Sequence, residues 1–93
     1  METTYVEKKA LENANYELAE YRMASSKEDI QEGILDLEYL YEQTMRQFNL
    51  CMSRKSSSVA TFGSNKADAL YEITYATSIM KEIISLKKKL LAL

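Results

Sequence analysis

The amino-acid sequence predicts an all-α fold, either a three-helix up-down bundle or a long antiparallel helical hairpin with a shorter N-terminal helix. The chain has 93 residues with no proline and only two glycines, so little in it would interrupt a helix. Apolar residues recur at helical spacing through three long segments. A chain of this length forms at most one domain, so we expect residues 1–93 to fold as a single unit.

Side chains that can cap a helix predict where each helix begins. Thr4 with Glu7, and Ser25 with Glu28, fit the pattern in which a hydroxyl and a carboxylate three residues later bond the free N–H groups of a first turn. Asn65 is a simpler cap. The predicted helices span about residues 4–24, 26–54 and 65–92, with a Ser-rich loop over about 55–64. The first junction has neither glycine nor proline, so one continuous rod formed by the first two helices is an alternative.

The second helix (26–54) has the clearest apolar period. Steps of four and three alternate along it and form an unbroken heptad seam. This heptad seam contains Ile30, Ile34, Leu37, Tyr41, Thr44, Phe48 and Cys51, and it is widened by Leu40, Met45 and Met52. We expect the heptad seam to pack against the third helix in an antiparallel hairpin.

The other two helices differ in the width of their apolar faces. The third helix (65–92) is apolar over about half of its circumference, a width typical of a helix with two neighbours. Its apolar face contains Ile73, Tyr75, Ala76, Ile79, Met80, Ile83, Ile84, Leu86, Leu90 and Leu91. The first helix (4–24) has a narrower stripe, made of Ala10, Leu11, Ala14, Leu18 and Tyr21. We therefore expect the first helix to lie along the hairpin.

Charge is unevenly distributed along the chain. Residues 1–42 carry eleven acidic and four basic residues, whereas residues 43–93 carry three acidic and eight basic ones. In an antiparallel bundle the two halves attract each other, which is the simpler interpretation. The alternative is an acidic surface that faces a basic partner. One form of this alternative is a mimic of a nucleic-acid backbone that blocks a nucleic-acid-handling enzyme.

The composition also bears on the kind of partner and on the compartment. The two basic clusters, Arg54-Lys55 with Lys66 and Lys87-Lys88-Lys89, are too small and lack the interleaved aromatic residues of a nucleic-acid interface. No uncharged stretch is long enough to span a bilayer. A single cysteine and the lack of a signal-peptide pattern favour a cytoplasmic protein. We expect a protein partner or self-association, and neither nucleic-acid nor membrane binding.

The side chains available for catalysis are few. Without histidine, the chain cannot form a Ser-His-Asp or Cys-His site, and a zinc site is close to excluded. Carboxylates spaced by four residues could share a cation, as in the pairs Glu28/Glu32, Glu32/Asp36 and Glu38/Glu42. These pairs lie on the solvent side of the heptad seam, where charged side chains are normally solvated. We therefore expect no enzymatic activity, no metal and no cofactor.

Apolar side chains that remain after the core is filled are the best candidates for a binding surface. Leu35 and Tyr39 lie one helical turn apart and point away from the heptad seam. Tyrosine and leucine beside carboxylates are typical of a surface that binds protein. The predicted partner-binding residues are Leu35, Tyr39, Glu32 and Glu42 on the second helix, and Tyr5 and Tyr16 on the first. The run Leu90-Leu91-Ala92-Leu93 is also more apolar than the end of a helix needs.

These residues predict a non-enzymatic protein-binding module, either an adaptor or an inhibitor, with small phage-type inhibitors as one example. An alternative is a structural homo-oligomer in which the same residues form the seam between subunits. A groove for a small molecule is a third interpretation of the exposed stripe.

Overall fold

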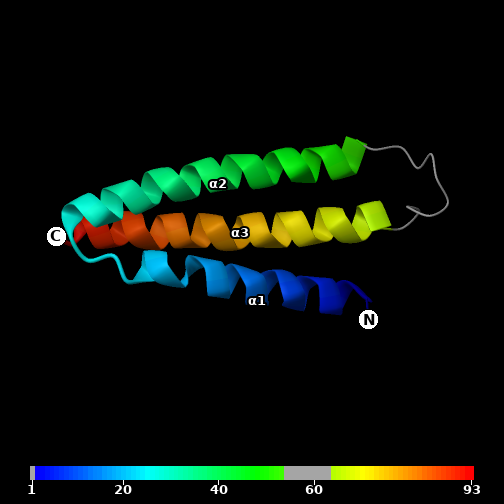
Figure 1. The fold of residues 1–93 in the computed structure, drawn as a ribbon, viewed down its shortest axis with the longest axis horizontal. Helices are drawn as coiled ribbons and strands as arrows, with labels where there is room; N and C mark the ends of the chain where they lie inside the picture. The colour runs from blue at the N-terminus through cyan, green and yellow to red at the C-terminus, as the bar shows by residue number, and fades with distance from the viewer. Residues whose placement is uncertain (1, 54–63) are drawn as a thin grey trace.

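The all-α prediction is confirmed by a computed structural model, which describes residues 2–53 and 64–93. Its helices are α1 (Glu2–Arg22), α2 (Lys27–Ser53) and α3 (Ser64–Leu91). They run up, down and up, so α2 is antiparallel to both α1 and α3 (Figure 1). Each boundary lies within about two residues of its predicted place, and the predicted loop over 55–64 falls outside the described residues except for Ser64.

The break between α1 and α2 excludes a continuous rod. Ser26 caps α2: the Asp29 N–H donates to Ser26 Oγ at 3.1 Å, and the Ile30 N–H donates to the Ser26 carbonyl at 2.9 Å. The prediction of a cap at Ser25 was therefore one residue early. Because two successive serines both stand before acidic residues, the sequence pattern alone does not choose between them.

Two other predicted caps were wrong in position. Thr4 lies inside α1, which begins at Glu2. Asn65 is the second residue of α3, which begins at Ser64. Both helices start earlier than their capping signals suggest, by an amount that is common at helix ends.

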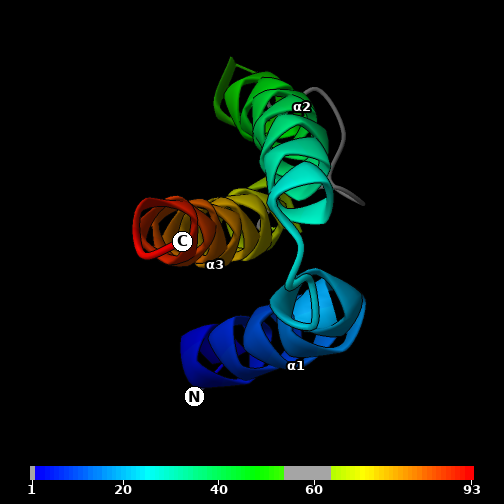
Figure 2. The same cartoon turned by 90° about the vertical axis from the view of Figure 1, so that its left-hand side faces the viewer.

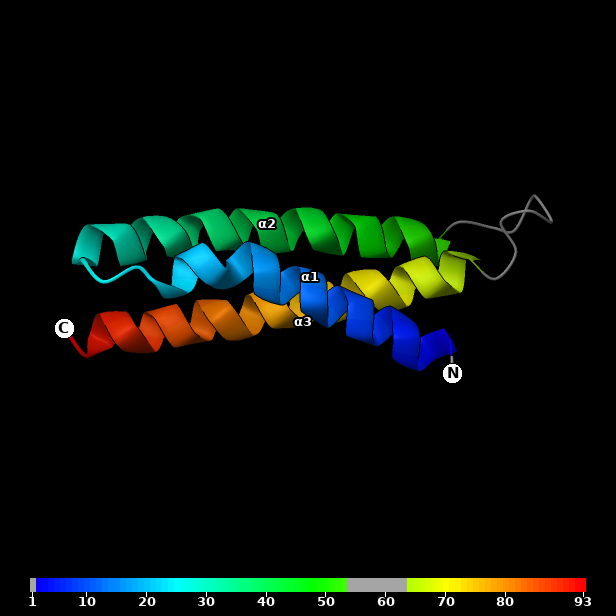
Figure 3. The same ribbon diagram turned by 60° about the horizontal axis from the view of Figure 1, so that its bottom comes forward.

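The central element of the fold is α3. It packs closely against α2 and also against α1, whereas α1 and α2 barely contact each other. The end-on view shows α1 and α2 on two flanks of α3 (Figure 2). α1 crosses α3 obliquely, so its C-terminal end lies on the side of α2 and its N-terminal end lies away from α2 (Figure 3). The wide apolar face of α3 therefore serves two neighbours, as predicted.

The core lies along α3 and confirms the heptad seam of α2. Of the seam residues, Tyr41 and Phe48 are partly buried and the other five are buried. Thr44 is a polar member of the seam, and its hydroxyl donates to the Leu40 carbonyl at 2.8 Å, which offsets the cost of burying it. The buried cluster consists of Ala14, Leu18, Ile30, Ile34, Leu37, Tyr75, Ile79, Ile83 and Leu86. Cys51 is also buried, as a seam position requires.

Four residues that were assigned to apolar stripes are exposed instead. Leu11 of α1, Met52 of α2, and Ile84 and Leu91 of α3 are each open to solvent. They lie at the edges of their stripes. Because α1 and α2 flank α3 without surrounding it, the edges of the α3 face stay uncovered. The periodicity located the stripes correctly but overestimated their buried width.

Polar contacts hold α1 on α3. Asn13 Nδ2 donates to the Tyr71 hydroxyl at 2.6 Å, and the Tyr75 hydroxyl donates to the Glu17 carboxylate. The Tyr71 and Tyr75 rings stack with centroids 6.0 Å apart. Since the α1 stripe contains small residues and buries little area, these bonds help to determine where α1 lies.

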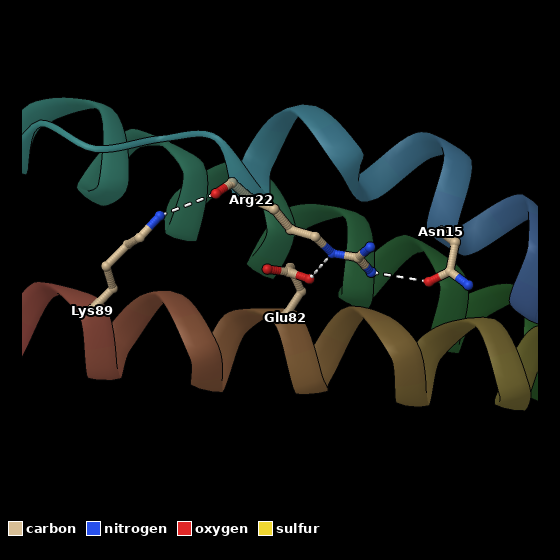
Figure 4. Close-up of polar contacts among 4 residues, drawn as sticks. All are labelled: Asn15, Arg22, Glu82 and Lys89. Carbon is tan, nitrogen blue, oxygen red and sulfur yellow. Dashed lines mark hydrogen bonds and ion pairs between the residues drawn. The ribbon is translucent and has the colours of Figure 1, made fainter.

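A second group of polar contacts lies at the C-terminal end of α1. Arg22 Nε donates to Glu82 Oε1 at 2.7 Å, and Arg22 also bonds Asn15 at 3.0 Å (Figure 4). Lys89 Nζ donates to the carbonyls of Arg22 and Ala24, at 3.1 and 2.5 Å. A cation at the end of a helix satisfies carbonyls that have no partner within the helix. These contacts fix α1 to the second half of α3.

Replacement of the buried Gly33 by alanine should stabilise the protein. A Cβ atom there would meet a methyl group of Leu86 and a ring carbon of Tyr21, each at 3.4 Å, which is at the short limit of ordinary van der Waals contact. Glycine inside a helix costs about 1 kcal/mol relative to alanine. We expect Gly33→Ala to raise the free energy of unfolding by up to ~1 kcal/mol in urea titrations. A clear loss of stability would show that the space between the helices is already full.

Candidate interaction surfaces

An apolar cleft lies between α2 and α3. It has a volume of about 660 Å³, and its apolar lining consists of Ile34 and Leu35 from α2 with Leu90 and Leu91 from α3. We call these four residues the leucine cleft. Ile34 is buried and Leu90 is partly buried, whereas Leu35 is 67% exposed and Leu91 is 87% exposed. The leucine cleft thus begins in the core and opens to solvent.

The rim of the leucine cleft is polar. Gln31, Glu38 and Lys87 complete its lining, and Lys87 Nζ lies 3.4 Å from Glu38 Oε2. Both side chains of this ion pair are about half exposed, so the pair contributes little to stability. An apolar centre with a half-exposed charged rim can accept another surface without leaving a charge buried alone.

A second concave surface lies between α1 and α2. Two hollows of about 550 and 390 Å³ share Glu20 and Tyr21 and together form one groove. The first hollow also contains Leu40 of α2 and Tyr75 of α3, so α3 closes the bottom of the groove. The second hollow continues between the end of α1 and the first turns of α2. We call the two hollows together the acidic groove.

Negative charge dominates the acidic groove. Its lining includes the carboxylates of Glu17, Glu20, Asp29, Glu32 and Asp36, and it contains no lysine or arginine. Within residues 2–53 and 64–93, neither Glu20, Glu32 nor Asp36 has an ion-pair partner. Burial, with added repulsion from Asp36 and Glu20, raises the pKa of Tyr21 above its usual value. The groove therefore disfavours further negative charge.

The structure separates the six predicted binding residues. Leu35 lies in the leucine cleft, and Tyr39, also 67% exposed, follows it one turn later on α2. Tyr16 and Glu32 line the acidic groove instead. Tyr5 and Glu42 are also exposed, and like Tyr39 they belong to the lining of neither surface. The predicted set is thus divided between two different faces of the molecule.

The sequence did not reveal that Leu91 lies in the same cleft as Leu35. Leu91 was assigned to the apolar face of the third helix, yet it extends from that face into solvent beside Leu35. The signal that points to it is the apolar run Leu90-Leu91-Ala92-Leu93. Periodicity within one helix does not reveal which exposed residue of another helix lies next to it.

The described part of the chain offers no candidate for a metal site or for a membrane-spanning helix. Among residues 2–53 and 64–93, no group of three His, Cys, Asp or Glu side chains is placed to hold a metal ion. In the same residues, no helix combines the length and the hydropathy needed to cross a bilayer. Outside the two surfaces, burial and the nearby Asp68 raise the pKa of Glu72 on α3.

Comparison with protein-family models, with curated proteins and with solved structures found no match to this chain.

Proposed function

We propose that this protein is a non-enzymatic protein-binding module, an adaptor or an inhibitor, which docks on its partner through the leucine cleft and the adjoining face of α2. One observation carries the proposal: Leu35 and Leu91 come from different helices, lie in one cleft and are both more than half exposed. Tyr39 extends this surface by one turn. The lack of histidine in the chain supports a role in binding rather than in catalysis.

The chemistry of the leucine cleft favours a protein as its partner. Single exposed apolar residues are common, but a group that surrounds a cleft and has a polar rim is typical of a protein interface. Burial of such side chains is worth about 25 cal/mol for each Å² of apolar surface removed from water. A partner that inserts one or two apolar side chains between Leu35 and Leu91 would gain this energy and leave Glu38 and Lys87 in solvent.

The second candidate is a homo-oligomer in which the same cleft receives another copy of the chain. The exposure of Leu35 and Leu91 supports it equally, so a separate measurement of mass is needed to choose between the two. For the compartment, we propose the cytoplasm, on the basis of the single cysteine.

The proposal predicts that Leu35→Glu combined with Tyr39→Glu abolishes partner binding and leaves the fold intact. Both side chains are mostly exposed, so their replacement should leave helicity and melting temperature unchanged within a few degrees. A matched control is Leu50→Glu with Met52→Glu, which adds the same charge to exposed apolar positions elsewhere on α2. The measurement is a tagged pull-down from the native host, with circular dichroism of each variant.

The outcomes separate the alternatives clearly. We expect one stoichiometric partner with the wild type and with the control, and none with the Leu35/Tyr39 variant. Unfolding of that variant would show that its two residues belong to the core. Equal capture by all three proteins would place the binding surface elsewhere.

A further inference from the structure

The acidic groove is a helix-packing site that the chain itself leaves open. α1 and α2 pack on two flanks of α3 (Figure 2) but barely on each other, and residues of both helices line the groove. Tyr21, Leu40 and Tyr75, one from each helix, form the deeper part of the lining. Tyr75 is buried, and Tyr21 and Leu40 are partly buried. In helix bundles, a groove between two helices with a third beneath it is the position of a fourth helix.

Carboxylates from both α1 and α2 line this groove. Glu20 of α1 faces a lining that contains Glu32 and Asp36 of α2. These three side chains are exposed, so water screens their repulsion, but among the described residues no lysine or arginine lies in the lining to balance their charge. Burial is the main reason that the pKa of Tyr21 is raised, and the charges of Asp36 and Glu20 add to it. Those two charges would stabilise a cation placed between the helices. A basic side chain that pairs with these carboxylates therefore has to come from outside the lining.

We propose that the acidic groove binds an amphipathic helix of a partner protein, which places apolar side chains over Tyr21, Leu40 and Tyr75 and lysine or arginine side chains beside Glu20, Glu32 and Asp36. This site is distinct from the leucine cleft and lies on another face. Its occupant follows from charge complementarity. The concave shape and the tyrosines suit a helix better than they suit the role of a nucleic-acid mimic, which needs acids on a convex surface.

A second copy of this chain is a poorer occupant. Its α1 and α2 would bring more carboxylates to the groove. Of its three lysines near the end of α3, Lys87 is paired with Glu38 and Lys89 bonds the carbonyls of Arg22 and Ala24, which leaves only Lys88 without such a contact among the described residues. A helix from another protein can place its basic residues without breaking these contacts.

The test uses a fluorescein-labelled synthetic peptide of about 18 residues, ~27 Å long as a helix, with leucine on one face and lysine on the other. Binding is measured by anisotropy, for the wild type and for Glu20→Lys with Asp36→Lys. The matched control is Glu7→Lys with Asp68→Lys, which makes the same change in charge near the N-terminal ends of α1 and α3. Both positions are exposed. Circular dichroism checks the fold of each protein.

We expect the Glu20/Asp36 variant to bind at least tenfold more weakly than the wild type, and the Glu7/Asp68 control to bind within threefold of it. A peptide with serine in place of leucine should also bind at least tenfold more weakly. In amide NMR spectra, the peptide should shift Tyr21, Gly33 and Leu40. Equal weakening in both variants would show that the peptide binds through the net charge of the protein alone, and it would overturn the proposal. So would shifts confined to Leu35 and Leu91.

A control without peptide addresses self-association through this groove. The wild type should sediment as a single species whose mass does not change in the Glu20/Asp36 variant. A dimer that this variant dissociates would overturn the proposal and assign the groove to a second copy.

Discussion

Replacement of Ile79 by alanine is expected to lower the free energy of unfolding by about 3–4 kcal/mol. Ile79 is completely buried and belongs to the core cluster on α3, the helix that both α1 and α2 pack against. Its truncation removes buried apolar atoms and leaves a cavity that neither neighbouring helix can fill without moving off the other contacts of α3. The change should therefore weaken the whole bundle. Urea unfolding, followed by circular dichroism, measures the effect.

Ile84→Ala is the matched control for this prediction. It makes the same chemical change on the same helix, but Ile84 is 47% exposed. We expect the free energy of unfolding to fall by less than about 1 kcal/mol, since truncation of Ile84 removes little buried apolar area. Equal losses at the two positions would contradict the arrangement, because they would require α3 to be covered on its open side as well.

Replacement of Arg22 by methionine is the second change with a large expected effect. Only 9% of the Glu82 side chain is exposed, and Arg22 is its ion-pair partner at 2.7 Å (Figure 4). Without the guanidinium, the Glu82 carboxylate would lie at the α1–α3 interface with no counter-charge. We expect the free energy of unfolding to fall by about 2–3 kcal/mol. This is less than for a fully buried ion pair, because Arg22 is about half exposed.

The position of Arg22 predicts which helix is less protected from hydrogen exchange in the Arg22→Met variant. Hydrogen exchange should become faster in α1 than in α2, since α1 is held mainly by its contacts with α3. Glu82→Gln in the Arg22→Met background should recover part of the loss by removal of the buried charge. Arg46→Met, at an exposed position of α2, is the control and should change stability by less than about 0.5 kcal/mol. Uniform exchange along the chain would contradict this role of Arg22.

Much of the fold is predictable from local pattern. The heptad seam from Ile30 to Cys51 identified the buried face of α2, and the broad apolar face of α3 indicated two neighbours. Both inferences depend only on the 3.6-residue period of a helix. The same period overestimated the buried width of α3, where Ile84 and Leu91 are exposed, because the covered arc depends on the angle between α1 and α2.

The binding surfaces are less predictable for a related reason. The exposure of Leu35 and Tyr39 could be predicted, because it follows from their place opposite the heptad seam. The proximity of Leu35 to Leu91 could not, because it depends on the register between α2 and α3. Likewise, Glu20 and Asp36 share a groove only because α1 crosses α3 toward α2. The number of charges in each half of the chain does not predict how α1 crosses α3.

The most direct test of the central claim, that the leucine cleft is open for a foreign protein, is the mass of the purified chain in solution. Sedimentation equilibrium at tens of micromolar should give the mass of one chain for the wild type. The Leu35→Glu/Tyr39→Glu variant should give the same mass. A wild-type dimer that this variant reduces to a monomer would contradict the account, because the leucine cleft would then be the seam of a homo-oligomer.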